Sequence, residues 1–256
     1  MDYRAPQAPP LGGCAVFLDI DGTLLDLAET PDAVVVPPHL RGLLHRLSSQ
    51  LQGALALISG RSLADIDRLF GPGIAAAAEH GAVLRNAGGR IIEDMAENAD
   101  LRALLGPLRA AVAAHPRTLL EAKRFGLVLH WRAAPAAAHA LITCATALAA
   151  AHPALELQPA HEALEIRVRG PGKAGALDRF MREPEFARRL PVFIGDDTTD
   201  EPAIARASAR GGLGLHVGRD FAGSPAAVLK WLEHALSKGE SGAQGERGAQ
   251  GEPGHG

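Results

Sequence analysis

The sequence predicts an α/β protein with a doubly wound parallel sheet, interrupted by an inserted α+β domain of αββαββ pattern. Short apolar runs alternate with amphipathic helical patterns towards both ends of the chain, which is typical of a parallel sheet covered by helices on both faces. Between residues 84 and 170, pairs of alternating polar and apolar runs follow helical patterns instead, which is typical of half-exposed antiparallel strands. The 256 residues are enough for two such domains.

The parallel part begins with a strand-like apolar run at residues 14–20. Residues 38–51 follow, with leucines at the spacing of an amphipathic helix. The run "ALALI" at 54–58 predicts a second buried strand, and residues 62–70 predict a second helix. After the insertion, the pattern predicts five further elements: helix 174–182, strand 191–194, helix 201–208, strand 213–217 and helix 225–236.

The inserted domain, predicted over 84–170, contains two helix–hairpin units. A helix at 100–114 precedes "TLLEAKRFGLVLHWR", whose two halves alternate about a central turn. A second helix at 136–151 precedes the alternating runs "LELQ" and "ALEIRV". We therefore expect the first domain to comprise residues 14–83 and 171–236.

Both ends of the chain lack the pattern of a packed element. Residues 1–13 are rich in proline and predict a disordered lead. The tail, 237–256, carries glycine at every third position from Gly239 to Gly254. That is the spacing of collagen, but so short a repeat with one proline would make a poor triple helix. The tail is therefore predicted to be flexible.

The composition excludes several classes of function. The net charge is −3 and the pI about 6.4, which gives no electrostatic case for binding nucleic acid or an anionic membrane. No apolar run reaches the roughly 18 residues that span a bilayer, and residues 1–13 lack the apolar segment of a signal peptide. Two cysteines are too few for a disulfide framework. We expect a cytoplasmic protein with reduced thiols.

Two aspartates, one residue apart, end the first apolar run in "AVFLDIDGTLL". Burying Asp19 and Asp21 together is unfavourable because carboxylates repel each other and resist desolvation. The motif alone leaves two explanations open: a solvated turn, which Asp and Gly favour, or a bound cation. An EF-hand loop is excluded because Thr23 and Thr30 would occupy the fifth and twelfth ligand positions.

Three further polar clusters follow where other strands of the sheet should end. They are "SGR" at 59–61, "GPGK" ending at Lys173, and "GDDTTDE" at 195–201. Because ligands bind at the carboxyl edge of a parallel sheet, we expect all four clusters to meet in one crevice. Mg²⁺ prefers carboxylate oxygens and keeps waters or a phosphate as further ligands, so it explains the paired aspartates. The third cluster also matches the DDxxD pattern of terpenoid synthases, but that motif lies inside a helix.

These residue types in this order predict phosphoryl transfer. Asp19 would attack phosphorus, as carboxylates do in aspartyl-phosphate enzymes. Asp21 would protonate the leaving alcohol and then take a proton from the hydrolytic water. Mg²⁺, Lys173, the Ser59 hydroxyl and glycine-backed amides such as that of Gly60 would offset the phosphoryl charge.

The four motifs in this order resemble those of the haloacid dehalogenase superfamily of phosphotransferases. The resemblance implies a Rossmann-like core. It also implies Mg²⁺ ligation by Asp19, the Asp21 carbonyl and Asp196, with Asp197 and Asp200 supporting the metal site. The transport ATPases of the superfamily have Thr two residues after the nucleophile, so Asp21 points instead to a phosphatase or a mutase.

Over about residues 14–236 the chain is similar to the trehalose-phosphatase family, through "VVVPPHL", "GALALISGRSL", "LEAKRFGLVLHWR", "LEIRVRG" and "PVFIGDDTTDE". The resemblance implies hydrolysis of trehalose 6-phosphate, the last step of trehalose biosynthesis, by a monomer linked functionally to trehalose-6-phosphate synthase. It implies that the inserted domain is a cap that binds the sugar. The implied substrate contacts are Arg61, Glu121, Lys123, His130, Arg132 and Glu165. Gly172 departs from the family, which usually has a polar residue before the lysine.

Three alternatives stay open at this point. The core motifs do not exclude a capped phosphatase of another sugar phosphate, such as sucrose or mannosylglycerate phosphate. A phosphosugar mutase would return the phosphoryl group to sugar instead of water. A catalytically inactive scaffold is disfavoured because Asp19, Asp21, Lys173 and Asp196 are all present.

Overall fold

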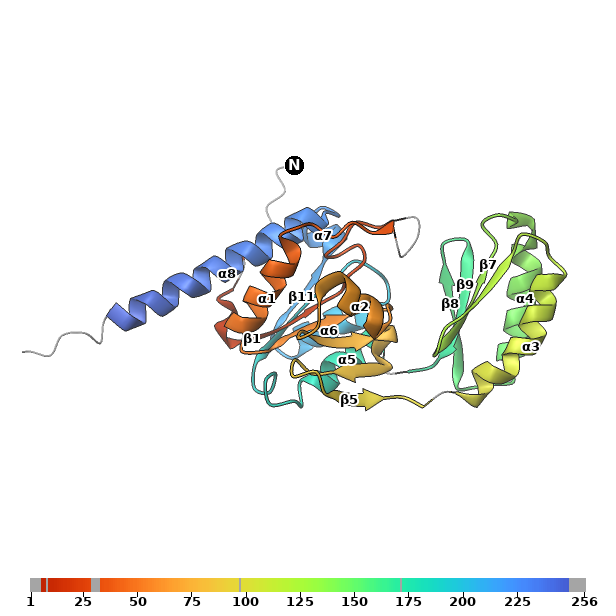
Figure 1. Cartoon of the computed structure of the whole chain (residues 1–256), viewed down its shortest axis with the longest axis horizontal. Helices are drawn as coiled ribbons and strands as arrows, with labels where there is room; N and C mark the ends of the chain where they lie inside the picture. The colour runs from red at the N-terminus through yellow and green to blue at the C-terminus, as the bar shows by residue number, and fades with distance from the viewer. Residues whose placement is uncertain (1–5, 8, 29–32, 97, 171, 249–256) are drawn as a thin grey trace, which may run out of the picture. The chain divides into compact units, whose positions relative to one another are not determined.

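The chain forms two compact units, Met1–Asp94 with Pro171–Gly256, and Met95–Gly170 (Figure 1). The computed structural model describes residues 6–7, 9–28, 33–96, 98–170 and 172–248. None of the described helices combines the length and the apolar character that crossing a membrane requires.

The first unit contains a seven-stranded sheet in the order β11-β10-β1-β2-β3-β4-β5. The five strands from β11 to β3 run parallel, and β4 and β5 are antiparallel to their neighbours. The strands are β1 (Cys14–Leu18), β2 (Leu55–Ile58), β3 (Ala75–Ala78), β4 (Val83–Arg85), β5 (Ile91–Asp94), β10 (Leu190–Gly195) and β11 (Leu213–His216). The predicted α/β fold with a mainly parallel sheet is confirmed.

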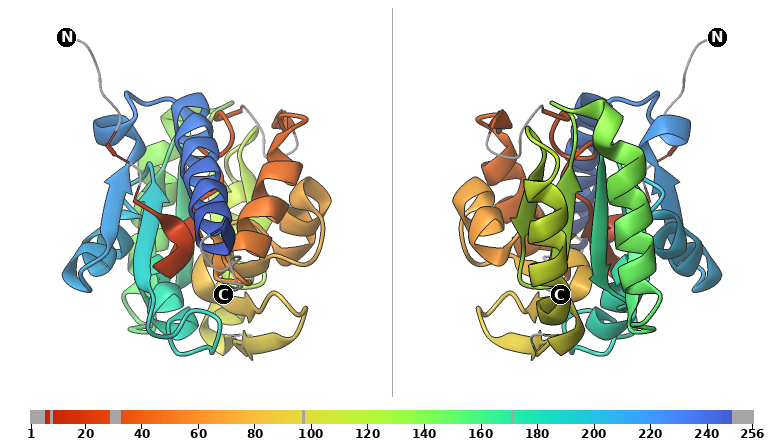
Figure 2. Two further views of the ribbon diagram at one scale, coloured as in Figure 1. Left: turned by 90° about the vertical axis from the view of Figure 1, so that its left-hand side faces the viewer. Right: turned by 90° about the vertical axis from the view of Figure 1, so that its right-hand side faces the viewer.

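The helices of this unit cover both faces of the sheet. The connections through α1 and α2 advance from β1 to β3, whereas α6 connects β10 to β11 in the opposite direction. A connection between two parallel strands is right-handed, so connections that advance in opposite directions along the sheet place their helices on opposite faces. Helix α8 lies beside α1, and α5 contacts α6 (Figure 2). The helical elements are η1 (Leu11–Gly13), α1 (Leu40–Gln50), α2 (Leu63–Phe70), η3 (Glu79–Gly81), α5 (Gly172–Phe180), α6 (Glu201–Ala209), α7 (Val217–Asp220) and α8 (Pro225–Gly248).

Strand β1 occupies an interior position in the sheet, between β10 and β2. All five of its residues are buried, which explains why its sequence is apolar throughout rather than alternating. Within it, Phe17 pairs with Phe193 on one side and Ala56 on the other. The residue after the strand is Asp19, so the chain delivers a carboxylate to the carboxyl edge of the parallel sheet.

The edge of the core sheet differs from the prediction. Strand β3 has the sequence "AAAA", which carries no strand-forming side chains and is not predicted from pattern; its complete burial makes it a strand. Strands β4 and β5 belong to this sheet, so the second unit begins at Met95 rather than at residue 84. The turn "NAGG" at 86–89, between two short apolar runs, is the hairpin signal for this pair.

Both predicted flexible ends are partly ordered. In the lead, Leu11 is buried and the Trp231 indole N–H donates to the Pro6 carbonyl at 2.7 Å, so disorder is wrong for this part. In the tail, α8 continues through Gly248, where the sequence predicts flexibility from residue 237. Once a helix is nucleated each added residue gains a hydrogen bond, and Glu, Ala, Gln and Arg between the glycines are good helix formers. Residues 249–256 lie outside the described residues.

The second unit packs two helices on a four-stranded antiparallel sheet in the order β6-β7-β9-β8. Its elements are α3 (Ala99–Ala113), β6 (Leu119–Ala122), β7 (Gly126–His130), η4 (Pro135–Ala137), α4 (Ala138–Ala149), β8 (Leu155–Ala160) and β9 (Ala163–Val168). This is the predicted αββαββ pattern.

The core of the second unit fills the space between its helices and one face of its sheet. Leu127, Leu129 and Trp131 point into this core, as their alternation predicts. Leu104 and Leu141 pack against them from α3 and α4.

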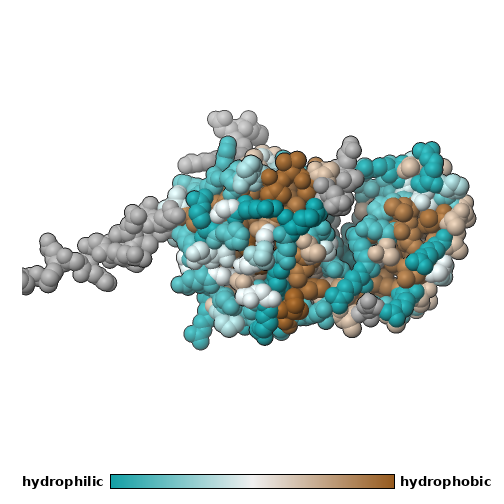
Figure 3. Space-filling model, viewed as in Figure 1, coloured by the Kyte–Doolittle hydropathy of each residue, from teal (hydrophilic) through white to brown (hydrophobic). Residues whose placement is uncertain are grey.

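The surface of the chain is largely polar in the view of Figure 3, with apolar residues gathered in a few patches.

Candidate active site

Asp19 is held at the end of β1 with its side chain buried, and the residue is 4% exposed. Its N–H donates to the Ile194 carbonyl at 3.0 Å, so the neighbouring strand β10 fixes its backbone. The chain then turns at Gly22, whose φ of 79° lies in the left-handed region that glycine adopts without strain. The turn returns the Thr23 hydroxyl to within 3.2 Å of Asp19 Oδ2 and 3.3 Å of Asp196 Oδ1.

Lys173 lies in the first turn of α5 and is 5% exposed. Its Nζ is 2.7 Å from Asp19 Oδ1 and 2.7 Å from Asp200 Oδ1. Burial disfavours the charged ammonium, but the two carboxylates outweigh burial and raise the pKa of Lys173 above its ordinary value. Lys173 is therefore a fixed positive charge between two buried carboxylates. Before it, Gly172 has a φ of 60°, which favours glycine at this position over the polar residue usual there.

The acidic loop after β10 is tied back on itself by Asp200. Asp200 Oδ2 accepts hydrogen bonds from the Asp197 N–H at 3.1 Å and the Asp196 N–H at 3.3 Å. A Cβ on Gly195 would overlap the Asp200 side chain, so glycine is required where the loop leaves the strand. The Asp197 carboxylate accepts from the Thr198 hydroxyl at 2.8 Å and does not join the carboxylate cluster described next.

Three carboxylates, those of Asp19, Asp196 and Asp200, each offer one oxygen within 4.8 Å of the others. Burial and the nearby Asp19 charge raise the pKa of Asp196 to about 7 and that of Asp200 to about 6. Lys173 therefore does not fully offset the burial and the mutual repulsion of these carboxylates. A Cβ on Gly22 would overlap the Asp196 carboxylate, so only glycine at this turn leaves room for the Asp196 oxygens. Such a donor set fits a hard divalent cation such as Mg²⁺.

The Asp21 side chain is directed to a different partner, Arg61. Arg61 Nε lies 2.7 Å from Asp21 Oδ2, and its Nη2 lies 2.6 Å from Asp21 Oδ1. The sequence predicts Arg61 as a substrate contact, but in the structure these two donors are engaged by the carboxylate. Asp21 contributes no side-chain oxygen to the cluster of Asp19, Asp196 and Asp200.

Ser59 and Gly60 follow β2, in line with the prediction that they end a strand. Ser59 is 2% exposed, and its Oγ accepts the Arg61 N–H at 3.2 Å. A Cβ on Gly60 would overlap the His80 ring, so only glycine allows this close approach. The His80 N–H in turn donates to the Ser59 carbonyl at 2.9 Å.

Sequence reasoning missed two contributors to this site. Thr23 was visible in "DIDGT", since a hydroxyl four residues after Asp19 returns to it across the Gly22 turn. The segment Glu79–His80–Gly81 follows the unpredicted strand β3, and all three residues have left-handed φ values of 49°, 57° and 95°. Strained backbone of this kind persists where its surroundings hold it, and it clusters at functional sites.

The predicted sugar contacts of the second unit lie mainly on one face of its sheet. Glu121 is opposite Val128, which is opposite Glu165, so the three residues form one row across β6, β7 and β9. His130 Nε2 is 3.0 Å from Glu121 Oε2, and Lys123 Nζ is 3.5 Å from Glu165 Oε1.

Arg132 lies beyond the end of β7. Its Nε donates to Glu162 Oε2 at 2.9 Å, at the turn between β8 and β9. The structure thus groups Glu121, Lys123, His130 and Glu165, and gives Arg132 a separate partner.

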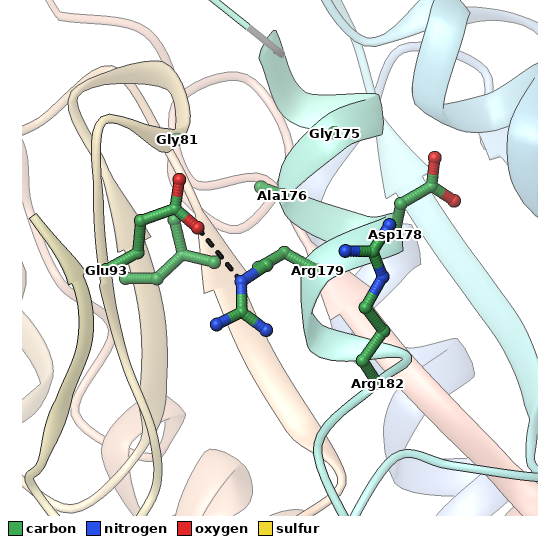
Figure 4. A pocket seen from close by; sticks show the side chains of 8 residues that line it. Gly81, Glu93, Gly175, Ala176, Asp178, Arg179 and Arg182 are labelled. Atoms are coloured by element: carbon green, nitrogen blue, oxygen red, sulfur yellow. Dashed lines mark hydrogen bonds and ion pairs between the residues drawn. The ribbon is translucent and has the colours of Figure 1, made fainter. Parts of the chain in front are cut away.

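A pocket beside α5 contains none of the predicted site residues (Figure 4). Arg179 points across it to Glu93 on β5, with Nε 3.0 Å from Glu93 Oε2. Both side chains are about one-third exposed, and such pairs contribute little stability. The Arg179–Glu93 pair nevertheless connects the edge strand β5 to α5, the helix that carries Lys173.

The sequence and the fold were compared with known proteins. A sequence model described as trehalose-phosphatase matches residues 17–221. A probable trehalose-phosphate phosphatase of Sinorhizobium fredii is 42% identical over 219 residues, which are 85% of this chain and 82% of that protein. A trehalose-6-phosphate phosphatase of Escherichia coli is 38% identical over 227 residues, 86% of this chain and 85% of that protein.

Solved structures share the fold at low sequence identity. The C-terminal domain of the Candida albicans trehalose-6-phosphate phosphatase has a TM-score of 0.69 and 19% identity, covering 93% of this chain and 99% of that one. A haloacid dehalogenase-like hydrolase from Bacteroides thetaiotaomicron has a TM-score of 0.61 and 15% identity, covering 86% of this chain and 98% of that one. These likenesses show the haloacid dehalogenase-like fold.

Proposed function

The chain belongs to the trehalose-phosphatase family of phosphoric monoester hydrolases, and we propose that it hydrolyses trehalose 6-phosphate through an aspartyl-phosphate on Asp19. The observation that carries this proposal is the setting of Asp19. A buried carboxylate at the carboxyl edge of a parallel sheet lies against Lys173, Thr23 and two further carboxylates. That combination of groups suits attack on a phosphoryl group whose charge is balanced locally.

In the first step, an oxygen of Asp19 forms a bond to phosphorus and the bond from phosphorus to the sugar oxygen breaks. Asp21 gives its proton to that sugar oxygen, so that neutral trehalose leaves. In the second step, Asp21 takes a proton from water as the water oxygen bonds to phosphorus. The bond between phosphorus and Asp19 then breaks, which returns the carboxylate and releases phosphate.

Other residues bind and orient the phosphoryl group. Lys173 supplies a fixed positive charge beside Asp19, and the Ser59 hydroxyl and the Gly60 amide are the proposed donors to phosphoryl oxygens. Asp19, Asp196 and the Asp21 carbonyl would hold Mg²⁺, with Asp200 beside them and Asp197 in the same loop. The ion, when bound, offsets phosphoryl charge that these residues alone leave unbalanced.

Membership of the family also supports a proposal for the biological setting. We propose that the reaction is the last step of trehalose biosynthesis, and that its substrate comes from a trehalose-6-phosphate synthase. We propose further that the chain acts as a cytoplasmic monomer.

The proposed activity is tested by measuring phosphate release with Mg²⁺ over a panel of sugar phosphates. The panel contains trehalose 6-phosphate, sucrose 6-phosphate, a mannosylglycerate phosphate and glucose 6-phosphate. We expect the highest kcat/KM for trehalose 6-phosphate. A higher value for another disaccharide phosphate would assign the chain a different substrate. Conversion of a sugar phosphate that depends on a bisphosphate activator and releases no free phosphate would indicate a mutase.

Removing the metal should change stability as well as activity. We expect Mg²⁺ to raise the Tm of the wild-type protein, by an amount equivalent to about 2.7 kcal/mol at a hundredfold excess over Kd. Asp196→Asn should abolish most of this shift, and it should not lower the metal-free Tm because it removes a carboxylate that its neighbours repel. Thermal unfolding with EDTA and with MgCl₂ measures both effects. Glu93→Gln, a carboxylate outside the cluster, is the control and should keep the full shift; loss of the shift in both variants would argue against this site.

The second unit should set the preference for trehalose. We expect Glu121→Ala, Lys123→Ala and Glu165→Ala each to lower kcat/KM for trehalose 6-phosphate by roughly tenfold or more, about 1.4 kcal/mol. In the wild-type protein their polar groups would pair with sugar hydroxyls, and removing one partner leaves a hydroxyl unpaired, which is costly. Hydrolysis of p-nitrophenyl phosphate should change little, because it needs only the core site.

The control for these variants is Asp100→Ala in the first turn of α3, where Asp100 Oδ1 lies 2.9 Å from His152 Nδ1. Asp100→Ala should leave both substrates unaffected. A parallel loss for both substrates in the Glu121, Lys123 or Glu165 variants would mean that these residues serve folding instead of recognition.

A further inference from the structure

Arg61 is a buried arginine whose guanidinium is directed at the proposed proton-transfer group. Its side chain is 7% exposed, whereas that of Asp21 is 34% exposed. The two hydrogen bonds, 2.7 Å from Nε to Oδ2 and 2.6 Å from Nη2 to Oδ1, form a bidentate pair in which one arginine holds both carboxylate oxygens. Such a pair fixes the plane as well as the position of the carboxylate.

The backbone of Arg61 is itself fixed on both sides. Its N–H donates to Ser59 Oγ at 3.2 Å, and its carbonyl accepts the Glu79 N–H at 2.9 Å. Glu79 begins the segment with positive φ values that ends at Gly81, and such a conformation is unfavourable for the two residues that are not glycine. The hydrogen bond from Glu79 connects this segment to the loop that carries Arg61. The backbone of Arg61 is therefore restrained at both its N–H and its carbonyl, and its side chain extends from there to Asp21.

We propose that Arg61 is a positioning residue that holds Asp21 in the place and plane needed for proton transfer. This inference rests on the proposed function. Each carboxylate oxygen has two lone-pair positions, so the bidentate pair leaves one on each oxygen to carry a proton. Arginine keeps its own protons at all working pH values. The proton thus passes from Asp21 to the leaving oxygen, and later from water to Asp21, while Arg61 orients the Asp21 carboxyl group in both steps.

The chain contains a matched control for this pair. Arg85 is also 7% exposed and forms a bidentate pair with Asp67, whose side chain is 33% exposed, through two hydrogen bonds of 2.7 Å. Arg85→Met should therefore lower the Tm about as much as Arg61→Met does. It should leave kcat for trehalose 6-phosphate unchanged, because Asp67 takes no part in the chemistry.

The variants Arg61→Met and Arg61→Lys test the proposal. We expect kcat for trehalose 6-phosphate to fall by about tenfold or more, since small displacements of a reacting group have effects of this size. KM should change little. The burst of nitrophenolate from p-nitrophenyl phosphate should keep nearly its wild-type rate, because that leaving group needs no proton. Arg61→Lys keeps the positive charge and serves as the second variant if Arg61→Met fails to fold, but a single ammonium cannot reproduce the two parallel hydrogen bonds of the guanidinium. A rise in KM with unchanged kcat, or an equal loss in the burst rate, would overturn the proposal.

A double-mutant cycle separates positioning from an independent role. In an Asp21→Asn background, replacing Arg61 by Met should cost little further single-turnover rate with trehalose 6-phosphate, because its effect acts through Asp21. Multiplication of the two losses would contradict the inference while leaving the roles of Asp19 and Asp21 intact. A failure of the proposed function would give a different result, because Asp21→Asn alone would then keep full activity.

Discussion

Asp19→Asn should fold normally and lose essentially all phosphatase activity, by roughly 10⁴-fold or more in kcat. The amide oxygen is a poor nucleophile, and no other carboxylate can take over from the same strand end. Asp21 is engaged with Arg61, and Asp200 is held by Lys173 and by two backbone N–H groups. The fold should persist because Lys173 keeps Asp200 as its partner.

Phosphate release from trehalose 6-phosphate and a thermal unfolding curve test this expectation together. Asp26→Asn is the control, because Asp26 is an exposed carboxylate in the same segment and should retain full activity. If Asp19→Asn keeps about a tenth of the wild-type turnover, Asp19 is not the nucleophile.

Lys173→Met should have the largest effect on stability. Removing the ammonium leaves Asp19 and Asp200 buried beside Asp196 without their cation. Breaking a buried ion pair from one side costs about 3–5 kcal/mol. Because the pKa of Lys173 is raised in the folded protein, its contribution to stability is fully present below the ordinary value of 10.5. That contribution is lost as the pH rises from 10.5 through the higher pKa of the folded state.

Thermal or urea unfolding at neutral pH with EDTA measures this loss. Added Mg²⁺ should restore part of the stability, since the ion offsets the same carboxylates, but not the phosphatase activity. Lys230→Met in α8, where the lysine is exposed, should change neither quantity. An unchanged Tm in Lys173→Met would show that the buried pairs contribute nothing to stability.

Three of the site residues could be placed at one edge of the core sheet because each one follows a strand of that sheet. Lys173 differs from the prediction, since it lies in the first turn of α5, after the last strand of the second unit. An apolar run that stops at Asp19, Ser59 or Asp196 is visible in the sequence, and parallel strands bring their carboxyl ends to one edge. Helix α1 and the second unit were predictable for a similar reason, since their apolar residues keep a regular period.

The remaining features depend on contacts that no local pattern records. The all-alanine β3 is a strand only because it is buried between β2 and β4. Arg61 is separated from Asp21 by 40 positions in the sequence, so its bidentate partner cannot be read from "SGR". The left-handed backbone at Glu79 and His80 is likewise set by its surroundings, since residues other than glycine seldom adopt that conformation.

The central claim is that the phosphoryl group passes through Asp19, and acid quenching tests it most directly. The Asp21→Asn variant is mixed with p-nitrophenyl phosphate and Mg²⁺, quenched in acid after the first turnover, digested and analysed by tandem mass spectrometry. Without its base, the variant should accumulate the intermediate. We expect the peptide containing Asp19 to carry one added phosphoryl group, placed on Asp19 itself. Release of nitrophenolate with no phosphorylated peptide, or with the phosphoryl group on another residue, would contradict the claim.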